Sequence, residues 1–387
     1  MIKKIKIVHV QLLPLLSGVQ RVTLDEMAQL DSSIFDRIVV CKCEGELTER
    51  LELIGVKFYL IPQLMRELSP VNDFFAFWSL LSFMIKQRPD IVHTHSSKTG
   101  ILGRFAAFIA NVPTIIHTVH GYSFQGEPSR VKKILYRFLE FIAAAVSTKI
   151  IVLNEEDRDL SVSFVNVAKN KLLLIPNGVD TDNFSPPSEH LKVALKSNFF
   201  GVCDPNHIII GMVARLSPQK NPICFIEAAF DIAERFNHVS FVLIGDGELR
   251  SSLEEMIKSS PHANRFFLLG WRKDVSQLLR SFDLFVLPSL WEGLPLSVLE
   301  AMSVGVPVIA SNIPGNKHIV SHNFDGRLFL SDDASSLSVE IESLIIDSSL
   351  RQLYSKRARK KVINSYSLTL RTRTVSLLYR SFSDSFR

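Results

Sequence analysis

The chain has 387 residues, of which 47% are hydrophobic, and a formal net charge of +5. This length suits two domains of roughly 100 to 200 residues each, and the hydrophobic fraction excludes a largely disordered chain. The charge is too small to indicate a nucleic-acid partner, although it suits phosphorylated ligands or an anionic membrane surface.

The first half alternates short apolar runs with helical patterns. Residues 4–10 are predicted as a strand and not as a signal peptide, because the apolar part is short and His9 and Gln11 interrupt it. Further strands are predicted at 37–43, 57–62, 90–95, 114–120, 149–154 and 171–178. Apolar strands alternating with amphipathic helices indicate a parallel sheet covered on both faces.

The same pattern restarts after a segment rich in Pro, Ser and Asn. Strands are predicted at 207–215, 239–248, 265–270, 284–288, 307–311 and 326–330, with helices near 225–235, 249–257 and 295–304. The predicted fold class is therefore α/β, with two doubly wound Rossmann-like domains whose strand ends face an interdomain cleft.

We place the domain limits as follows: an N-terminal Rossmann-like domain at 1–182, a connection at 183–205, a C-terminal Rossmann-like domain at 206–365, and a terminal helix at 366–387 that packs back on the N-terminal domain.

No membrane span or disulfide framework is indicated. The apolar run 74–85 is too short to cross a bilayer, so a cytoplasmic protein is expected. The four cysteines lack the paired C-x-x-C spacing of zinc sites and are predicted to be free thiols in a reducing compartment. The cysteines are Cys41, Cys43, Cys203 and Cys224.

Two carboxylates, Glu292 and Glu300, stand in the otherwise apolar stretch 287–315. The pattern predicts a buried strand, a loop and a helix that opens with Pro295, so amides of the loop lie at the positive end of the helix, where a phosphate is stabilised. Glu300 lies on the same face as Ser297, three residues earlier. Buried carboxylates need hydrogen-bond donors, and ligand hydroxyls would supply them, although helix capping and salt bridging remain an alternative.

Two cations follow an earlier strand of the second half. Arg215 ends this strand, and Lys220 comes just before the helix that Pro222 opens. Cations at a strand end beside a helix start suit a diphosphate, although solvated surface cations remain an alternative.

His120 closes a buried strand and is followed by Gly121. His93, His95 and His117 precede it, but H-T-H in a strand lacks the carboxylate or cysteine partners usual for zinc, so no metal is predicted. Two other patterns are set aside. Asp180-Thr181-Asp182 opens the segment rich in Pro, Ser and Asn between the two sets of strands. G-D-G-E at 245–248 is no complete dinucleotide fingerprint, which argues against a nicotinamide oxidoreductase.

Basic residues also mark two helices of the first half. Ser97, Lys98 and Arg104 follow the strand at 90–95. Residues 130–138 combine basic and apolar side chains, which fits either a helix lying on an anionic bilayer or an ordinary packed helix.

These motifs together resemble the retaining glycosyltransferases of family 4, which have the GT-B fold. The resemblance covers nearly the whole chain and rests on six segments in the family's order. They are S-G-V-Q at 17–20, H-T-V-H-G-Y at 117–122, I-P-N-G-V-D at 175–180, G-M-V-A-R-L-S-P-Q-K-N at 211–221, L-I-G-D-G-E at 243–248 and W-E-G-L-P-L-S-V-L-E at 291–300.

The resemblance implies that the domain at 1–182 binds the acceptor and the domain at 206–365 binds the nucleotide-sugar. It also implies a role for each matching residue. Arg215 and Lys220 would neutralise the diphosphate of a nucleotide-sugar, and Glu300 would accept hydrogen bonds from ribose hydroxyls. Glu292 and His120 would contact the donor sugar as the other catalytic residues. The donor-binding set is completed by Gly18, Gly270, Trp271, Arg272, Gly293, Leu294 and Ser297. No cofactor and no metal are expected, because Arg, Lys and helix amides supply the positive charge.

Three positions depart from the family's pattern: Ser17 precedes Gly18 where many relatives have two glycines, Asn316 stands where Glu is frequent, and Asn154 replaces a common Ser. The function implied is the transfer of a sugar with retention of its anomeric configuration. The expected donor is a UDP-N-acetylhexosamine. The acceptor implied is a polyprenyl-diphosphate-linked glycan at the inner leaflet of the plasma membrane, in bacterial surface-polysaccharide synthesis. Ser97, Lys98 and Arg104 are expected on the acceptor side, against the lipid diphosphate. A sugar-nucleotide epimerase or hydrolase of the same fold, or a non-catalytic nucleotide-sugar-binding protein, remains an alternative.

Overall fold

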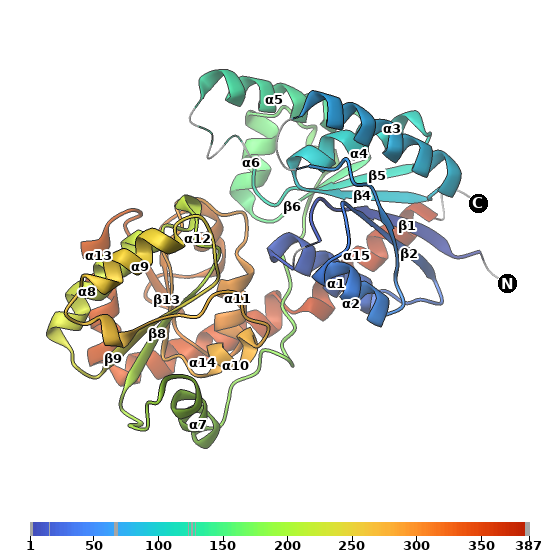
Figure 1. Ribbon diagram of the computed structural model, residues 1–387. Helices are drawn as coiled ribbons and strands as arrows, with labels where there is room; N and C mark the ends of the chain where they lie inside the picture. The colour runs from blue at the N-terminus through green and yellow to red at the C-terminus, as the bar shows by residue number, and fades with distance from the viewer. Residues whose placement is uncertain are drawn as a thin grey trace. The chain divides into compact units, whose positions relative to one another are not determined.

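The protein divides into two compact units, shown in the computed structural model of Figure 1. Unit 1 comprises Met1–Gly178 and Leu368–Arg387, and unit 2 comprises Val179–Ser367. The structure describes residues 3–14, 16–65, 69–122, 124, 127 and 129–383. Each unit is an α/β structure built on one parallel sheet, so the prediction of two doubly wound Rossmann-like domains is confirmed.

Unit 1 contains a seven-stranded sheet in the order β3-β2-β1-β4-β5-β6-β7. The strands are β1 (Ile5–Val10), β2 (Phe35–Cys41), β3 (Lys57–Leu60), β4 (Ile91–His95), β5 (Thr114–Thr118), β6 (Lys149–Val152) and β7 (Leu172–Leu174). The helices are α1 (Gly18–Gln29), α2 (Glu46–Leu53), α3 (Pro70–Gln87), α4 (Ser97–Ile109), α5 (Arg130–Ala145), α6 (Glu155–Ser163) and, from the end of the chain, α15 (Leu368–Ser383).

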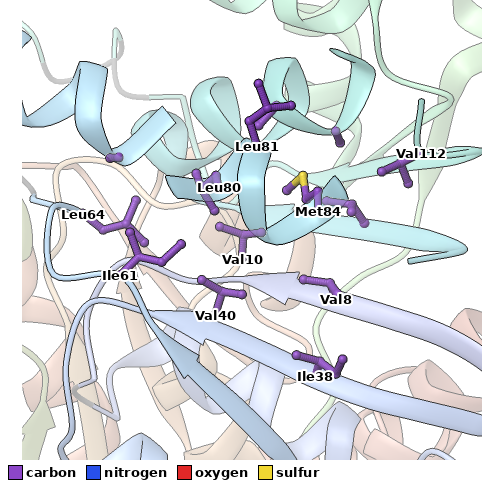
Figure 2. Packing of buried hydrophobic residues seen from close by; sticks show 14 of the residues in the cluster. Val8, Val10, Ile38, Val40, Ile61, Leu64, Leu80, Leu81, Met84 and Val112 are labelled. Carbon is purple, nitrogen blue, oxygen red and sulfur yellow. The ribbon is translucent and has the colours of Figure 1, made fainter. Parts of the chain in front are cut away.

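The pleat of the strands divides the core of unit 1 into two layers. Val8 and Val10 of β1 point to the face that α3 covers, where Figure 2 shows them beneath Leu80 and Met84. Ile7 points to the opposite face, into a cluster that helices α1, α2 and α15 complete. Alternate residues of one strand face opposite sides of the sheet, so His9 lies on the α15 side.

Unit 2 contains a six-stranded sheet in the order β10-β9-β8-β11-β12-β13. The strands are β8 (Ile208–Val213), β9 (Val239–Ile244), β10 (Phe266–Leu268), β11 (Leu284–Leu287), β12 (Val308–Ser311) and β13 (Gly326–Phe329). The helices are α7 (Glu189–Phe200), α8 (Pro222–Arg235), α9 (Arg250–Lys258), α10 (Val275–Arg280), α11 (Leu296–Ser303), α12 (Pro314–Ile319), α13 (Ala334–Ile346) and α14 (Ser348–Ser365).

The stretch 183–205, which we expected to be a connection, contains the helix α7 within unit 2. Lys196 of this helix is buried, and its Nζ lies 2.7 Å from a carboxylate oxygen of Asp283 and 2.6 Å from the carbonyl oxygen of His207. The clusters of Pro, Ser and Asn mark only the turns around α7. Composition therefore overestimated the length of this connection.

The end of the chain belongs to unit 1. Val375 and Tyr379 of α15 are fully buried in the same cluster as Ile7 of β1. Figure 1 shows α15, in red, beside the blue elements of unit 1. In the described part of the chain, no helix is both long and apolar enough to cross a membrane.

Candidate active site

Strand order places the candidate residues of unit 2 at the centre of its sheet. β8 pairs with β9 on one side and with β11 on the other, so the order of the strands reverses between β8 and β11. Ligands of doubly wound sheets bind at the carboxyl ends of the strands beside such a switch point. The loop after β8 carries Arg215 and Lys220, and the loop after β11 carries Glu292.

Lys220 and Glu292 form an ion pair across this switch point, between Lys220 Nζ and Glu292 Oε1. The hydroxyl of Ser289 donates a second hydrogen bond, 2.6 Å long, to the same oxygen. Only 9% of Glu292 is exposed. The two opposite charges compensate each other in this partly buried place, where either charge alone would be costly.

Backbone contacts hold the two loops together around the ion pair. The amide of Leu290 donates to the carbonyl oxygen of Gln219 over 2.8 Å, and Gln219 Nε2 donates to the carbonyl oxygen of Trp291 over 2.9 Å. Sequence reasoning missed Gln219 and Ser289. Their polar side chains beside Lys220 and Glu292 were the only available signal, and polar residues are common in loops.

The loop that carries Glu292 also rests on the start of α12. A Cβ atom on Gly315 would lie 2.6 Å from the carbonyl oxygens of both Glu292 and Gly293, so only glycine permits this approach. The next residue, Asn316, is fully buried and donates from Nδ2 to the carbonyl oxygen of Ser311 over 3.0 Å. Asn316, which departs from the family's pattern, is therefore part of the support beneath this loop.

Helix α11 follows the same loop. Gly293 and Leu294 lie directly before its N-cap residue, Pro295, and are buried. Ser297 and Glu300 are half-buried, whereas Val298 and Leu299 between them are fully buried in the core. The two polar residues therefore share the face of α11 that is turned away from the core, as the spacing predicted.

Arg215 is exposed at the turn after β8, where a glycine-rich segment packs against it. A Cβ on Gly245, which has φ +130°, would lie 1.9 Å from the carbonyl oxygen of Ala214. A Cβ on Gly247 would lie 2.3 Å from the carbonyl oxygen of Leu216. The glycines of G-D-G-E thus let two backbone segments touch.

The turn after β10 lies beside this segment. The amide of Gly245 donates to the carbonyl oxygen of Gly270 over 2.8 Å, and Gly270 has φ +66°. Trp271 is 62% exposed, which leaves an aromatic face for a ligand. The guanidinium of Arg272 makes two hydrogen bonds with Asp274, of 2.8 and 2.6 Å.

Two candidates of unit 1 follow strands at the centre of the other sheet. The strand order reverses between β1 and β4, and β5 lies beside β4. Gly18 is exposed at the first position of α1, after β1. His120 comes two residues after the end of β5, and its ring is half-buried.

A chain of buried side chains leads away from His120. Its Nε2 lies 3.1 Å from His95 Nδ1, and His95 Nε2 lies 2.9 Å from His9 Nδ1. Burial, with a smaller contribution from the charge of Arg371, lowers the pKa of His9 to about 3 and that of His120 to about 3. Burial also holds the pKa of His95 well below its usual range, so these imidazoles are neutral at pH 7.

Three buried histidines of unit 1 lie close enough together to share a metal ion. His9, His93 and His95 each offer a ring nitrogen within 4.8 Å of the others. Both nitrogens of each ring already contact another side chain at 2.6 to 3.1 Å, however. The rings therefore fit a hydrogen-bonded network better than a set of metal ligands, and the absence of a metal requirement stays a prediction.

The expected acceptor residues are placed differently from one another. Ser97 and Lys98 are half-buried at the start of α4, and Lys98 Nζ lies 2.5 Å from Asp73 of α3. Arg104 is fully buried, and its NH2 group lies 2.7 Å from Glu140 of α5. The expectation that Arg104 contacts a lipid diphosphate is therefore wrong, because this side chain ties α4 to α5 inside unit 1.

Two other positions have structural roles. Asn154 caps α6 by accepting a hydrogen bond from the amide of Asp157 over 2.7 Å. Asp180 accepts hydrogen bonds from the amides of Asp182 and Asn183, each 3.1 Å long. Asp180 therefore stabilises its own turn.

Comparison with known proteins gives matches along both units. Residues 16–183 match the family model described as Glycosyltransferase Family 4, and residues 198–361 match the model described as Glycosyl transferases group 1. The chain is 42% identical over 379 residues to the Escherichia coli UDP-Gal:alpha-D-GlcNAc-diphosphoundecaprenol alpha-1,3-galactosyltransferase, covering 97% of each chain.

A more distant relative and a solved structure extend the comparison. The N,N'-diacetylbacillosaminyl-diphospho-undecaprenol alpha-1,3-N-acetylgalactosaminyltransferase of Campylobacter jejuni is 26% identical, over 85% of this chain and 87% of the relative. The crystal structure of Anabaena HepE in complex with UDP-glucose superposes with a TM-score of 0.83 at 19% identity, over 97% of this chain and 99% of that one. At this identity the second likeness shows a shared fold.

Proposed function

The chain belongs to glycosyltransferase family 4, and on that premise we propose that it transfers galactose from UDP-galactose to an N-acetylglucosamine carried on undecaprenyl diphosphate. The reaction retains the anomeric configuration and serves bacterial surface-polysaccharide synthesis. The observation that carries this proposal is the 42% identity to an Escherichia coli enzyme whose name states this donor and this acceptor.

The chemistry available in unit 2 supports this proposal. The diphosphate of the donor needs cations, and Arg215 and Lys220 lie in one short segment at the switch point. When the donor binds, Lys220 exchanges Glu292 for a phosphate oxygen, and the released carboxylate accepts a hydrogen bond from a sugar hydroxyl. The amides before α11 face the phosphates from the positive end of that helix. Glu300 accepts hydrogen bonds from the ribose.

The transfer step then balances without a cofactor. The bond between the anomeric carbon and the phosphate oxygen breaks, and the acceptor oxygen bonds to the same face of that carbon. The acceptor hydroxyl gives its proton to the leaving phosphate. Cationic side chains and helix amides stabilise the charge on the leaving diphosphate, so we propose that the reaction needs no metal.

The choice of donor is the sharpest part of the proposal. Our first expectation was a UDP-N-acetylhexosamine, a class of donor that would suit an N-acetylgalactosaminyltransferase such as the Campylobacter jejuni relative. Galactose is preferred because the relative with 42% identity is a galactosyltransferase. One N-acetyl group changes the shape of the sugar enough for a site to discriminate between the two.

Contact with the membrane is the second part of the proposal. Helices α3, α4 and α5 of unit 1 carry an exposed apolar surface, and α4 contacts both neighbours. We define the helical apolar surface as Val71, Phe74, Phe75, Trp78 and Ile85 of α3, Phe108 and Ile109 of α4, and Val131, Ile134, Leu135, Phe138 and Phe141 of α5. Figure 1 shows the three helices together in unit 1.

Charge favours an anionic bilayer as the occupant of this surface. Arg130, Lys132 and Arg137 of α5 are exposed among the apolar side chains of the same helix. Aromatic and basic residues on one surface are typical of proteins that lie on the interface of an anionic membrane. A lipid-linked acceptor would be reached from such a position, at the cytoplasmic face of the plasma membrane.

A transfer assay tests the proposal. The purified protein is incubated with UDP-galactose, UDP-N-acetylgalactosamine, UDP-N-acetylglucosamine or UDP-glucose, with and without N-acetylglucosaminyl-diphosphoundecaprenol. We expect a product only when acceptor is present, most rapidly with UDP-galactose, and an α-linkage in its NMR spectrum. Turnover of the donor without acceptor would favour the epimerase or hydrolase alternative, and binding without any turnover would favour the non-catalytic one.

A further inference from the structure

A hydrogen-bonded chain of five side chains in unit 1 starts at a carboxylate and ends at His120. Its anchor is Glu26 of α1, which is fully buried. The hydroxyl of Tyr379, on α15, lies 2.8 Å from Glu26 Oε1. The chain then passes through His9 and His95 to His120. Of these five side chains, His120 is the one that we expect to contact the donor sugar.

The anchor fixes the direction of the first hydrogen bond. Burial raises the pKa of Glu26, and the guanidinium of Arg371, 3.6 Å from Glu26 Oε2, opposes this rise. The hydroxyl of Tyr379 donates its single proton to Glu26 Oε1. Burial and the neighbouring Glu26 hold the pKa of Tyr379 well above its usual range, which keeps this proton on the phenol.

The phenol oxygen can then only accept from its other two neighbours. His9 Nε2 lies 3.0 Å from this oxygen, and His93 Nδ1 lies 2.6 Å from it. Both nitrogens therefore carry protons. A neutral imidazole carries one proton, so the second nitrogen of each ring is an acceptor. His93 Nε2 finds its donor in the hydroxyl of Thr118, 2.7 Å away.

The same rule, one proton on each neutral imidazole, fixes the protonated nitrogen of His95 and then of His120. His9 Nδ1 is bare and accepts from His95 Nε2 over 2.9 Å. His95 Nδ1 is then bare and accepts from His120 Nε2 over 3.1 Å. The proton of the neutral His120 is consequently on Nε2, and its Nδ1 is bare.

We propose that Tyr379 is a positioning residue that sets the tautomer of His120 through the two histidines between them. The bare Nδ1 of His120 then accepts a hydrogen bond from a hydroxyl of the donor sugar and cannot donate one. This last step rests on the proposed function, whereas the tautomer is a property of unit 1 alone. The inference assigns a role in the reaction to Tyr379 of helix α15, which lies some 260 residues after His120 in the sequence.

The tautomer can be measured directly in the unaltered protein. With histidine labelled with ¹⁵N, long-range correlation spectra distinguish a protonated ring nitrogen from a bare one, and the signals of His120 are identified by their loss in His120→Gln. We expect a neutral ring with a protonated Nε2 and a bare Nδ1 at pH 7. A protonated Nδ1, a mixture of tautomers or an imidazolium would overturn the proposal without any assay of activity.

A variant tests the action of Tyr379. Tyr379→Phe keeps the aromatic ring, whose centroid lies 6.2 Å from that of Phe35. It removes the hydroxyl oxygen that accepts hydrogen bonds from His9 and His93. We expect a mixture of tautomers at His120 and a fall in kcat on the order of tenfold, the scale at which outer hydrogen-bond partners of metal-bound histidines act. An unchanged tautomer in a folded Tyr379→Phe protein would overturn the proposal.

The matched control is Tyr366→Phe in unit 2. The hydroxyl of Tyr366 is also largely buried and donates to the carbonyl oxygen of His318 over 2.9 Å, away from the chain of histidines. This variant also loses one buried hydroxyl, so a general effect of that loss on stability appears in both proteins. We expect Tyr366→Phe to leave the tautomer and kcat as in the unaltered protein. Equal falls in kcat in both variants would contradict the positioning role.

Donor analogues test the contact of Nδ1. Each hydroxyl of the galactose is replaced in turn by fluorine, which accepts but does not donate a hydrogen bond. We expect one analogue to lose kcat/KM in the unaltered protein, and to lose much less, relative to UDP-galactose, in Tyr379→Phe. Equal losses in both proteins would contradict the contact. If no UDP-sugar binds at all, the proposed function fails, and the measured tautomer still decides the role of Tyr379.

Discussion

The ion pair between Lys220 and Glu292 joins the loops that follow the two strands at the centre of the second sheet. The two residues are 72 positions apart, and the hydroxyl of Ser289 adds a donor to the same carboxylate oxygen. The pair keeps both charges compensated in the protein without a donor. Under the proposed function, a bound nucleotide-sugar offers both groups new partners, a phosphate for the lysine and a hydroxyl for the carboxylate.

Substitution of the two acids of this region, Glu292 and Glu300, is expected to change different kinetic constants. Glu292→Ala should lower kcat by about a hundredfold, because it removes a hydrogen bond at the reacting sugar. Glu300→Ala should raise the KM for the donor by about tenfold with a smaller change in kcat, because it removes a hydrogen bond to the ribose. Steady-state kinetics over a range of donor concentrations separates the two effects. Equal and small effects would return both residues to a structural role.

Loss of the lysine should weaken binding of the donor. Lys220→Met removes a cation from the diphosphate and leaves Glu292 without its ion-pair partner. We expect the Kd for UDP-galactose, measured by calorimetry, to rise by at least about tenfold, the scale of one hydrogen bond to a charged group. The matched control is Lys273→Met, an exposed lysine of the same unit. Equal affinities of the two variants would contradict the assignment of Lys220.

Removal of metals should leave the reaction unchanged. In the proposed reaction, Arg215 and Lys220 provide the positive charge that a divalent cation would otherwise supply. We expect the rate in excess EDTA to equal the rate in added Mg²⁺ or Mn²⁺. A rate that EDTA abolishes and that a divalent ion restores would contradict metal independence and would direct attention to His9, His93 and His95 as ligands.

Acid should destabilise unit 1 before it reaches the pKa values of its buried histidines. The pKa of His9 is about 3 in the folded protein and about 6.5 in an unfolded chain. Its contribution to stability is complete above pH 6.5 and is lost as the pH falls from 6.5 towards 3, because the unfolded chain binds the extra proton. One such group lowers the free energy of unfolding by up to about 1.4 kcal/mol per pH unit in this range.

Hydrogen exchange at pH 7.0 and 5.5, corrected for the intrinsic rates, measures this effect segment by segment. We expect protection of β1 and β4 to fall more than that of β8 and β9, whose unit lacks a comparable cluster of buried histidines among its described residues. Equal changes in the two sheets would show that the histidines are not the cause.

The helical apolar surface should bind anionic vesicles. Phe74→Ser and Phe138→Ser together remove two exposed aromatic side chains from α3 and α5. We expect this double variant to sediment less with vesicles of phosphatidylglycerol and phosphatidylethanolamine, while its transfer to a short, water-soluble acceptor is unchanged. Val339→Ser and Ile346→Ser together, two exposed apolar residues of unit 2, are the control. Equal sedimentation of both double variants would contradict the assignment of this surface.

Local pattern was sufficient for much of the fold. Apolar runs such as 207–215 and 239–248 contain β8 and β9, because β-branched and apolar residues suit a strand buried on both faces. Ser297 and Glu300 lie on one face of α11 because a helix brings residues three apart together. Arg104 shows the limit of such reasoning. Its place in a helix was predictable, but its burial against Glu140 depends on the neighbouring helix α5.

Short segments read in order were enough to predict most of the elements, the family and the residue types at the candidate site, although helix α7 was missed. The partners of these residues depend on the tertiary structure. Lys220 meets Glu292 because β8 and β11 are neighbours in the sheet. His9 pairs with His93 between β1 and β4, and α15 returns to unit 1 to bring Tyr379 to both. Contacts between residues so far apart depend on strand order and helix packing, which no local pattern records.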